Sequence, residues 1–147
     1  MELALAKAMI KRFEGCILTP YLCPAGVPSI GYGSTRYEDG SSVSLSDGAI
    51  SKDRAEAMLD RDLAVNRVPL LFSACQAPLN DGQAAALLDF IYNLGGGAFR
   101  ASTLRRRINS GDYATATTEF YKWVYCAGKR SRGLLTRRDA EARLFGA

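Results

Sequence analysis

FEGCILTPYLCPAGVPSIGYG, residues 13–33, joins the end of an expected helix to a run rich in glycine, proline and aromatic residues. Apolar residues recur at helical spacing up to its first position: Leu3, Ala6, Met9, Ile10 and Phe13. Glu14 therefore lies where the buried face of this helix ends, and Gly15 is expected to end the helix. A carboxyl group half sheltered by apolar neighbours has a raised pKa, so Glu14 could stay protonated as a general acid. The simpler alternative is that Glu14 only forms an ion pair or ends the helix.

The spacing E-G-x7-C-P-A-G-x2-S-I-G-Y-G, residues 14–33, resembles the catalytic signature of the phage-type lysozymes, the endolysins of tailed bacteriophages. In that family a Glu-Gly ends the first helix, an Asp or Cys follows, and a Thr lies further on in a strand. The resemblance covers nearly the whole chain. Other segments resemble family landmarks in the same order: ISKDRAE (50–56), FIYNLG (90–95), GAF (97–99), STL (102–104), Trp123 and RRDAE (137–141).

The resemblance implies an α+β, lysozyme-like fold in a single domain over residues 1–147. A small β-containing lobe is expected at about 15–50, a connecting helix at about 51–73 and a helical lobe at about 80–147. The family fold also implies that helix 2–13 packs on the helical lobe and that a cleft separates the lobes. A chain of 147 residues has the length of one typical domain.

Local signals refine this outline. Short strands are expected at residues 29–32 and 43–45, between turns rich in Gly and Pro. Ser51 is a good N-cap for the connecting helix, and Pro69 is expected to end or kink it. Further helices are predicted from Asn80 or Asp81 to Gly95, and over 103–109, 113–125 and 136–145.

The resemblance assigns catalytic roles to Glu14, Cys23 and Ser29. Cys23 stands where many relatives carry a carboxylate; a thiol beside a carboxylate is expected to have a raised pKa and to be neutral at pH 7. It would position water or a sugar, or simply fill space. Ser29 replaces the family's Thr and could hold a water opposite Glu14, or only bond a backbone group. A separated acid and water-holding hydroxyl would invert the anomeric centre.

Four further residues are candidates for substrate binding: Tyr32, Asn93, Lys129 and Arg137. The amide of Asn93 and the aromatic ring of Tyr32 could bind N-acetyl sugars. Lys129 and Arg137, together with Arg132, could pair with Glu14 or with an anionic substrate. Asn93 could instead simply be the C-terminal residue of a helix. The chain departs from the family pattern at Ser34, where a His is common, and at Pro28, where a bulky residue is usual.

The residue inventory excludes several kinds of chemistry. The chain has no His, and Cys16, Cys23, Cys75 and Cys126 lack metal-ligand spacing, so no metal and no cofactor are expected. Without His, Ser-His-Asp and Cys-His catalysis are also excluded. The four thiols are expected to be reduced. Phe90, Phe99, Phe120, Trp123 and Phe145 are expected in the core rather than as sugar platforms.

No apolar run approaches a membrane span, and residues 1–12 resemble neither a signal peptide nor an anchor. We therefore expect no stable membrane insertion. The chain should stay in the host cytoplasm and reach the cell wall only after a separate factor permeabilises the membrane. A monomer is expected.

The net charge of +4 is unevenly distributed, with +7 from Arg100 onward and −3 before it. A basic half suggests anionic envelope polymers as partners beside bacterial peptidoglycan.

The leading hypothesis is a muramidase that hydrolyses the β-1,4 bond between N-acetylmuramic acid and N-acetylglucosamine for host-cell lysis. The alternatives are a lytic transglycosylase on the same bond, or a non-enzymatic basic module that binds envelope polymers or nucleic acid. The complete signature around Glu14 argues against the last, so nucleic acid is not an expected partner.

Overall fold

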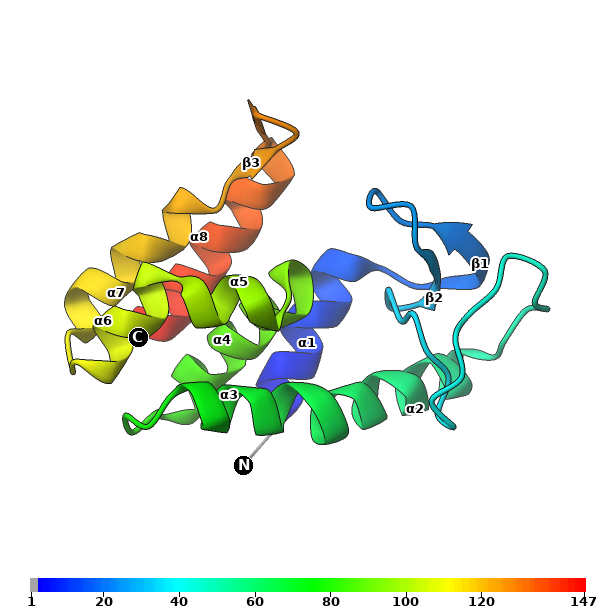
Figure 1. The fold of residues 1–147 in the computed structure, drawn as a ribbon, viewed down its shortest axis with the longest axis horizontal. Coiled ribbons are helices and arrows are strands. Elements are labelled where there is room, and N and C mark those ends of the chain that lie inside the picture. Colours follow the sequence, from blue (N-terminus) through cyan, green and yellow to red (C-terminus); the bar gives the residue numbers. More distant parts are fainter. Residues whose placement is uncertain (1–2) are drawn as a thin grey trace. The chain divides into compact units, whose positions relative to one another are not determined.

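The computed structural model describes residues 3–147 and divides into two compact units (Figure 1). The helical unit comprises the chain up to Met9 together with Arg67–Ala147. The hairpin unit comprises Ile10–Asn66. Helices and two short antiparallel sheets occur together, so the predicted α+β class is confirmed.

Helix α1 (Ala4–Glu14) begins in the helical unit and ends in the hairpin unit. It ends where the sequence predicts. Gly15 adopts a φ of 66°, a left-handed conformation that glycine reaches without steric cost, and its N–H still donates to the Lys11 carbonyl at 3.2 Å. Glu14 is therefore the last residue of α1, at the point where the chain turns into the first strand.

Strands β1 (Ile17–Leu22) and β2 (Pro28–Gly31) form an antiparallel hairpin in the hairpin unit. Tyr21 lies opposite Ser29 across the two strands, and the register shifts between Ile17 and Tyr21. The strand predicted for residues 29–32 is thus present, offset by one residue.

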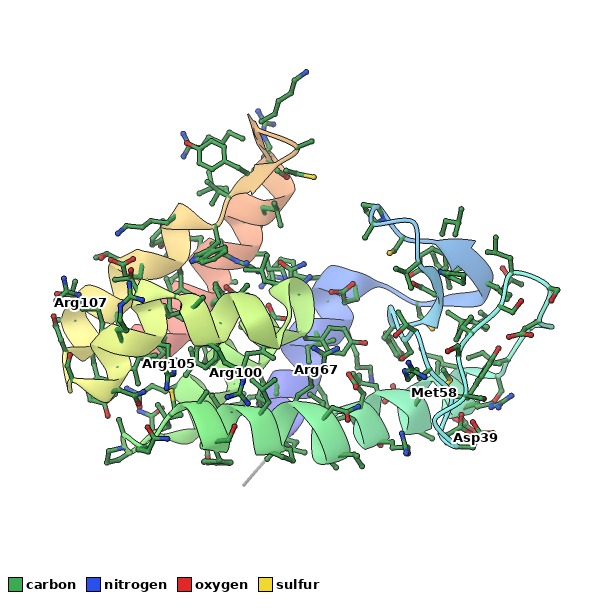
Figure 2. The ribbon with its side chains drawn as sticks, viewed as in Figure 1. Asp39, Met58, Arg67, Arg100, Arg105 and Arg107 are labelled. Atoms are coloured by element: carbon green, nitrogen blue, oxygen red, sulfur yellow. The ribbon has the colours of Figure 1, made fainter. Side chains whose placement is uncertain are left out.

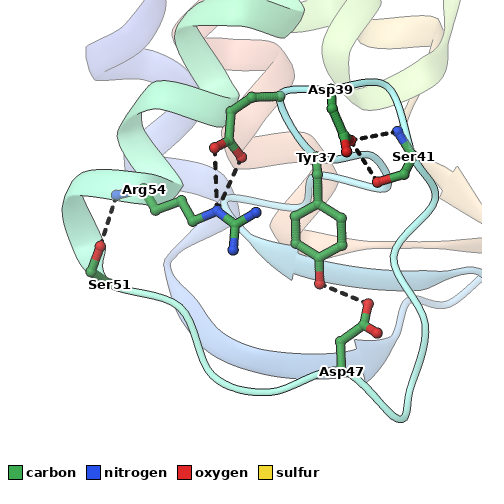
Figure 3. Close-up of polar contacts among 7 residues, drawn as sticks. Tyr37, Asp39, Ser41, Asp47, Ser51 and Arg54 are labelled. Carbon is green, nitrogen blue, oxygen red and sulfur yellow. Dashed lines mark hydrogen bonds and ion pairs between the residues drawn. The ribbon is translucent and has the colours of Figure 1, made fainter.

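The strand predicted for residues 43–45 is wrong, because polar side chains close this loop on itself (Figure 3). The Tyr37 hydroxyl donates to Asp47 at 2.7 Å, and the same carboxylate accepts the Ser44 N–H at 2.8 Å. Asp39 accepts both the N–H and the hydroxyl of Ser41. Such local hydrogen bonds offer the backbone an alternative to a strand ladder.

Helix α2 (Lys52–Asp62) begins at the predicted N-cap, because the Ser51 hydroxyl accepts the Arg54 N–H at 3.1 Å. A π-helical turn, η1 (Leu63–Arg67), and helix α3 (Val68–Ala74) continue the run. Pro69 lies in the first turn of α3, where its missing N–H costs nothing. The regular α-helix therefore ends at Asp62, before Pro69, and resumes at Val68 after the π-helical turn.

The helical unit also contains the remaining elements: α4 (Asp81–Leu94), α5 (Gly96–Ala101), α6 (Thr103–Asn109), α7 (Tyr113–Glu119), η2 (Phe120–Lys122), β3 (Tyr125–Cys126), β4 (Lys129–Arg130) and α8 (Arg132–Gly146). Of the two residues expected to begin α4, Asn80 is the N-cap, and it forms a reciprocal capping box with Gln83. The helix predicted over 113–125 is too long, since α7 stops at Glu119. The β3–β4 hairpin and α5 were not predicted.

The core of the helical unit is apolar and rich in aromatic rings. Ala6 of α1 belongs to it, together with residues of α3 to α8. Phe90 packs edge-to-face against Phe99, Phe120 and Trp123 at centroid distances of 5.5–6.2 Å. The prediction that the aromatic residues of this half form core is confirmed, with Phe145 also buried. In the hairpin unit, the buried apolar residues come from α1, β2, α2, η1 and the loops between β2 and α2, but not from β1: Ile10, Ile30, Tyr32, Val43, Ile50, Ala55, Met58, Leu59 and Leu63.

All four cysteines are free, as expected. Among residues 3–147, no helix has the length and apolar character needed to cross a bilayer.

Candidate active site

Glu14 is half-buried at the C-terminal end of α1. The phenol of Tyr21, on β1, lies within electrostatic reach of it. Burial raises the pKa of Tyr21, and the negative charges of Glu14 and Cys23 add to this effect. The phenol therefore stays protonated near neutral pH beside both groups. The hairpin unit thus brings Glu14 and Cys23 to the same tyrosine.

Cys23 lies in the tight turn between β1 and β2. Its N–H donates to the Val27 carbonyl at 3.0 Å, and the Gly26 N–H donates to the Cys23 carbonyl at 2.8 Å. A backbone hydrogen bond from Val27 lowers the pKa of the Cys23 thiol, with smaller contributions from the Ala25 backbone and the Ser29 side chain. The expectation that this pKa is raised is therefore wrong. Hydrogen bonds to the thiolate outweigh the effect of burial.

Ser29 is buried on β2, with 1% of its surface exposed. Its hydroxyl donates to the Val27 carbonyl at 3.0 Å, which is the backbone contact weighed as the simple alternative. Its oxygen still has lone pairs that can accept from water. The water-holding role of Ser29 stays a prediction.

Tyr32 follows β2, and only 3% of its surface is exposed. Its hydroxyl donates to Glu56 of α2 at 3.2 Å. Burial, then the charge of Glu56, raises the pKa of Tyr32 to about 12. The Tyr32 hydroxyl is therefore hydrogen-bonded to a carboxylate of its own unit. The contact of Tyr32 with substrate stays a prediction.

Asn93 and Arg137 belong to a buried polar network between α4 and α8 of the helical unit. Arg137 binds Asp89 with two hydrogen bonds, at 2.9 and 2.8 Å, and both side chains are buried. Arg138 donates to Asn93 at 2.8 Å and pairs with Glu141 at 2.8 Å. Asn93 is thus held by an arginine rather than merely ending its helix.

Lys129 lies on β4 of the exposed β3–β4 hairpin, beside Arg130. Lys129, Arg132 and Arg137 all belong to the helical unit, whereas Glu14 belongs to the hairpin unit. Their predicted pairing with Glu14 stays a prediction.

The sequence-predicted residues therefore form two groups. Glu14, Cys23, Ser29 and Tyr32 lie in the hairpin unit, and Asn93, Lys129 and Arg137 lie in the helical unit. Sequence reasoning missed Tyr21, Glu56 and Asp89. Tyr21 is identified by the strand register that sets it opposite Ser29, and one sequence does not specify that register.

A half-buried glutamate at a helix end, next to a two-stranded hairpin and followed by a helical unit, defines a lysozyme-like enzyme. Comparisons with known proteins agree. The family model described as phage lysozyme matches residues 11–141. An endolysin of Acyrthosiphon pisum secondary endosymbiont phage 1 is 39% identical over 141 residues, covering 93% of this chain and 92% of that protein. An endolysin of Salmonella phage P22 is 38% identical over 136 residues, covering 92% of this chain and 91% of that protein.

Solved structures give the same result. An endolysin from Escherichia coli O157:H7 phage FAHEc1 superposes with a TM-score of 0.86 at 33% identity, covering 99% of this chain and 93% of that one. The chain belongs to the phage lysozyme family, and its fold is the lysozyme-like α+β fold. Its class is accordingly that of the enzymes that lyse bacterial peptidoglycan.

Proposed function

We propose that this chain is a muramidase that hydrolyses the β-1,4 bond between N-acetylmuramic acid and N-acetylglucosamine, with inversion at the anomeric carbon. The observation that carries the proposal is the grouping of Glu14 with Cys23 and Ser29 within one compact unit. Tyr21 connects the acid to the hairpin turn electrostatically, and Ser29 lies opposite Tyr21 in the sheet.

The chemistry follows from these groups. Glu14, in its protonated form, donates a proton to the glycosidic oxygen as the bond to the anomeric carbon breaks. A water held by the Ser29 hydroxyl attacks that carbon from the opposite face and passes its proton to solvent. Because position 23 is a cysteine, no second carboxylate stabilises the developing positive charge there.

Four further residues are proposed to contact the substrate. Tyr32 and Asn93 suit the N-acetyl groups of the glycan, and Lys129 and Arg137 suit its carboxylates. The helical unit carries thirteen Lys and Arg against seven Asp and Glu, so anionic envelope polymers are further candidate partners.

Glu14→Gln tests the proposal directly, since an amide of the same shape cannot donate the catalytic proton. We expect no clearing of permeabilised cells by this variant, with a circular dichroism spectrum and melting temperature like those of the wild type. Clearing at a near wild-type rate would show that Glu14 is not the acid.

A lytic transglycosylase is the second candidate, and the cysteine at position 23 favours it, because that reaction needs only one carboxylate. The muramyl hydroxyl then attacks in place of water. Mass spectrometry of muropeptides released from purified wall distinguishes the two: reducing muramic ends indicate hydrolysis, and 1,6-anhydro ends indicate transglycosylation.

We also propose that the enzyme acts as a monomer from the host cytoplasm after a separate factor opens the membrane. In lysis assays it should therefore clear cells with permeabilised membranes and leave intact cells unaffected.

A further inference from the structure

Two side chains of the hairpin unit, Lys11 and Tyr32, converge on Glu56 of α2. Lys11 of α1 forms an ion pair with the Glu56 carboxylate. Tyr32, which follows β2, donates its hydroxyl to the same carboxylate oxygen at 3.2 Å. The Lys11 ammonium also lies 5.4 Å from the centre of the Tyr32 ring. One carboxylate of α2 thus connects α1 to the strand that carries Ser29.

The backbone around Glu56 is fixed by close packing. Ala55 lies directly against Gly31 of β2, and a Cβ atom at Gly31 would come within 3.1 Å of the Ala55 methyl group. Ala55 is fully buried and Tyr32 nearly so. The Glu56 side chain is only 25% exposed, so its ion pair is partly shielded from water. The packing of Ala55 on β2 therefore fixes the backbone from which the Glu56 side chain extends.

The partners of Glu56 lie next to the proposed catalytic groups. Lys11 precedes Glu14 by three residues, and side chains at this spacing share one face of a helix. Tyr32 follows Ser29 by three residues, just beyond the end of β2. A small displacement of the last turn of α1 would move the Glu14 carboxylate relative to Ser29 and Cys23. Displacements of about 1 Å can cost a large factor in rate.

We propose that Glu56 is a positioning residue: by binding Lys11 and Tyr32 together, it holds the last turn of α1, and with it Glu14, in register with β2. This inference rests on the proposed function, in which Glu14 is the acid and Ser29 holds the water. In this proposal Glu56 acts only through Lys11 and Tyr32.

Glu56→Gln tests the proposal, because the amide can still accept from Tyr32 but no longer attracts Lys11. Glu38→Gln is the matched control: Glu38 also lies in the hairpin unit and pairs with a basic residue, Arg54 at 3.2 Å, but its side chain is 39% exposed and its partner belongs to α2 rather than α1. Both variants remove one negative charge, so any effect of net charge on binding an anionic substrate is the same in both.

We expect Glu56→Gln to lower kcat at least tenfold on soluble, uncross-linked peptidoglycan strands, with KM changed less than twofold. Glu38→Gln should leave both constants within twofold of the wild type. Measurements are made well below both melting temperatures, so that a lower folded fraction does not account for the loss. In a double-mutant cycle, Lys11→Met should lower kcat, and adding it to Glu56→Gln should cost little more.

The proposal is overturned if Glu56→Gln keeps kcat within twofold, or if its effect equals that of the control. It is equally overturned if the two single losses simply add in the double variant. The Glu14→Gln variant assayed on the same strands separates the two proposals. An active Glu14→Gln variant removes the proposed function, whereas an inactive one beside a fully active Glu56→Gln variant removes only the positioning role.

Discussion

Cys23 lies in the turn between β1 and β2. Hydrogen bonds in the β1–β2 turn lower the pKa of its thiol, so the thiolate forms at a lower pH than in an unperturbed cysteine. If the thiol only fills space and leaves the water to Ser29, Cys23→Ala should keep most activity. Ser29→Ala should then cost roughly tenfold or more, about 1.4 kcal/mol of barrier. Initial rates of wall clearing by the two variants test this expectation.

A nucleophilic Cys23 predicts a different result. The thiolate would form a thioglycoside, the anomeric centre would be retained, and Cys23→Ala would be as inactive as Glu14→Gln. NMR of the first-formed anomer, read together with the activity of Cys23→Ala, distinguishes the two cases. We expect inversion, and we expect Cys23→Asp to be tolerated, because a carboxylate there would stabilise developing positive charge.

Helices α4 and α8 are joined by the buried network of Asp89, Arg137, Arg138 and Glu141. Burial raises the pKa of Glu141 to about 10, well above its value in an unfolded chain, so the folded state keeps a proton that the unfolded state releases. The stability from this proton is complete below the unfolded pKa of 4.5 and is lost as pH rises toward 10. Glu141→Gln should therefore flatten the decline of the unfolding free energy with pH, by up to about 1.4 kcal/mol per pH unit. Urea titrations from pH 5 to 9 measure this slope.

Asp89→Asn is the informative comparison within the same network. It leaves the Arg137 guanidinium buried without its carboxylate, and we expect a destabilisation of about 3 kcal/mol at pH 7. Glu141→Gln should cost clearly less at that pH, since it replaces a neutral group by a neutral one. Equal losses in the two variants would mean that Glu141 is ionised in the folded state.

The β3–β4 hairpin contains a conformational strain that substitution can relieve. Ala127 adopts a φ of 51°, a left-handed conformation that costs a residue with a side chain about 1 kcal/mol. Ala127→Gly should stabilise the chain by up to about 1 kcal/mol, measured as the free energy of unfolding. Ala114→Gly, at an exposed site inside α7, is the control and should destabilise by a similar amount. A loss of stability in both variants would contradict this account.

Elements with clear local signals were predictable from the sequence. The Asn80 capping box and the stop at Gly15 fix the ends of α4 and α1 through contacts within a few residues. Segment 43–45 was not predictable, because hydrogen bonds from nearby side chains compete there with a strand ladder. The end of α7 was not predictable either, because the helix passes into the turn η2 at Phe120 with no Gly or Pro nearby to mark its end. The same limit applies to the site. Glu14 follows from its place at a helix end, whereas Glu56 requires knowing that α1 and β2 meet on one face of α2.

At the scale of the whole molecule, charge is divided between the units. The helical unit has a net charge of +6 and the hairpin unit −2. Many of these arginines also have structural contacts. Arg100 and Arg105 reach toward the C-terminal end of α3 (Figure 2), where Arg105 donates to the Ala74 carbonyl at 2.7 Å. Reversing the charge of Arg105 would therefore damage the fold as well as any docking to the wall.

Arg106 and Arg107 offer a cleaner test of electrostatic docking, because both are exposed and their contacts are peripheral. Attraction between a basic surface and an anionic wall is screened to about 8 Å at physiological ionic strength, so lysis should slow as salt rises. Replacing both arginines by Gln should weaken that salt dependence while leaving the melting temperature near that of the wild type. Replacing Lys52 and Arg61 of the hairpin unit by Gln removes the same charge and should leave the salt dependence intact. If all three proteins show the same salt profile, Arg106 and Arg107 take no part in docking.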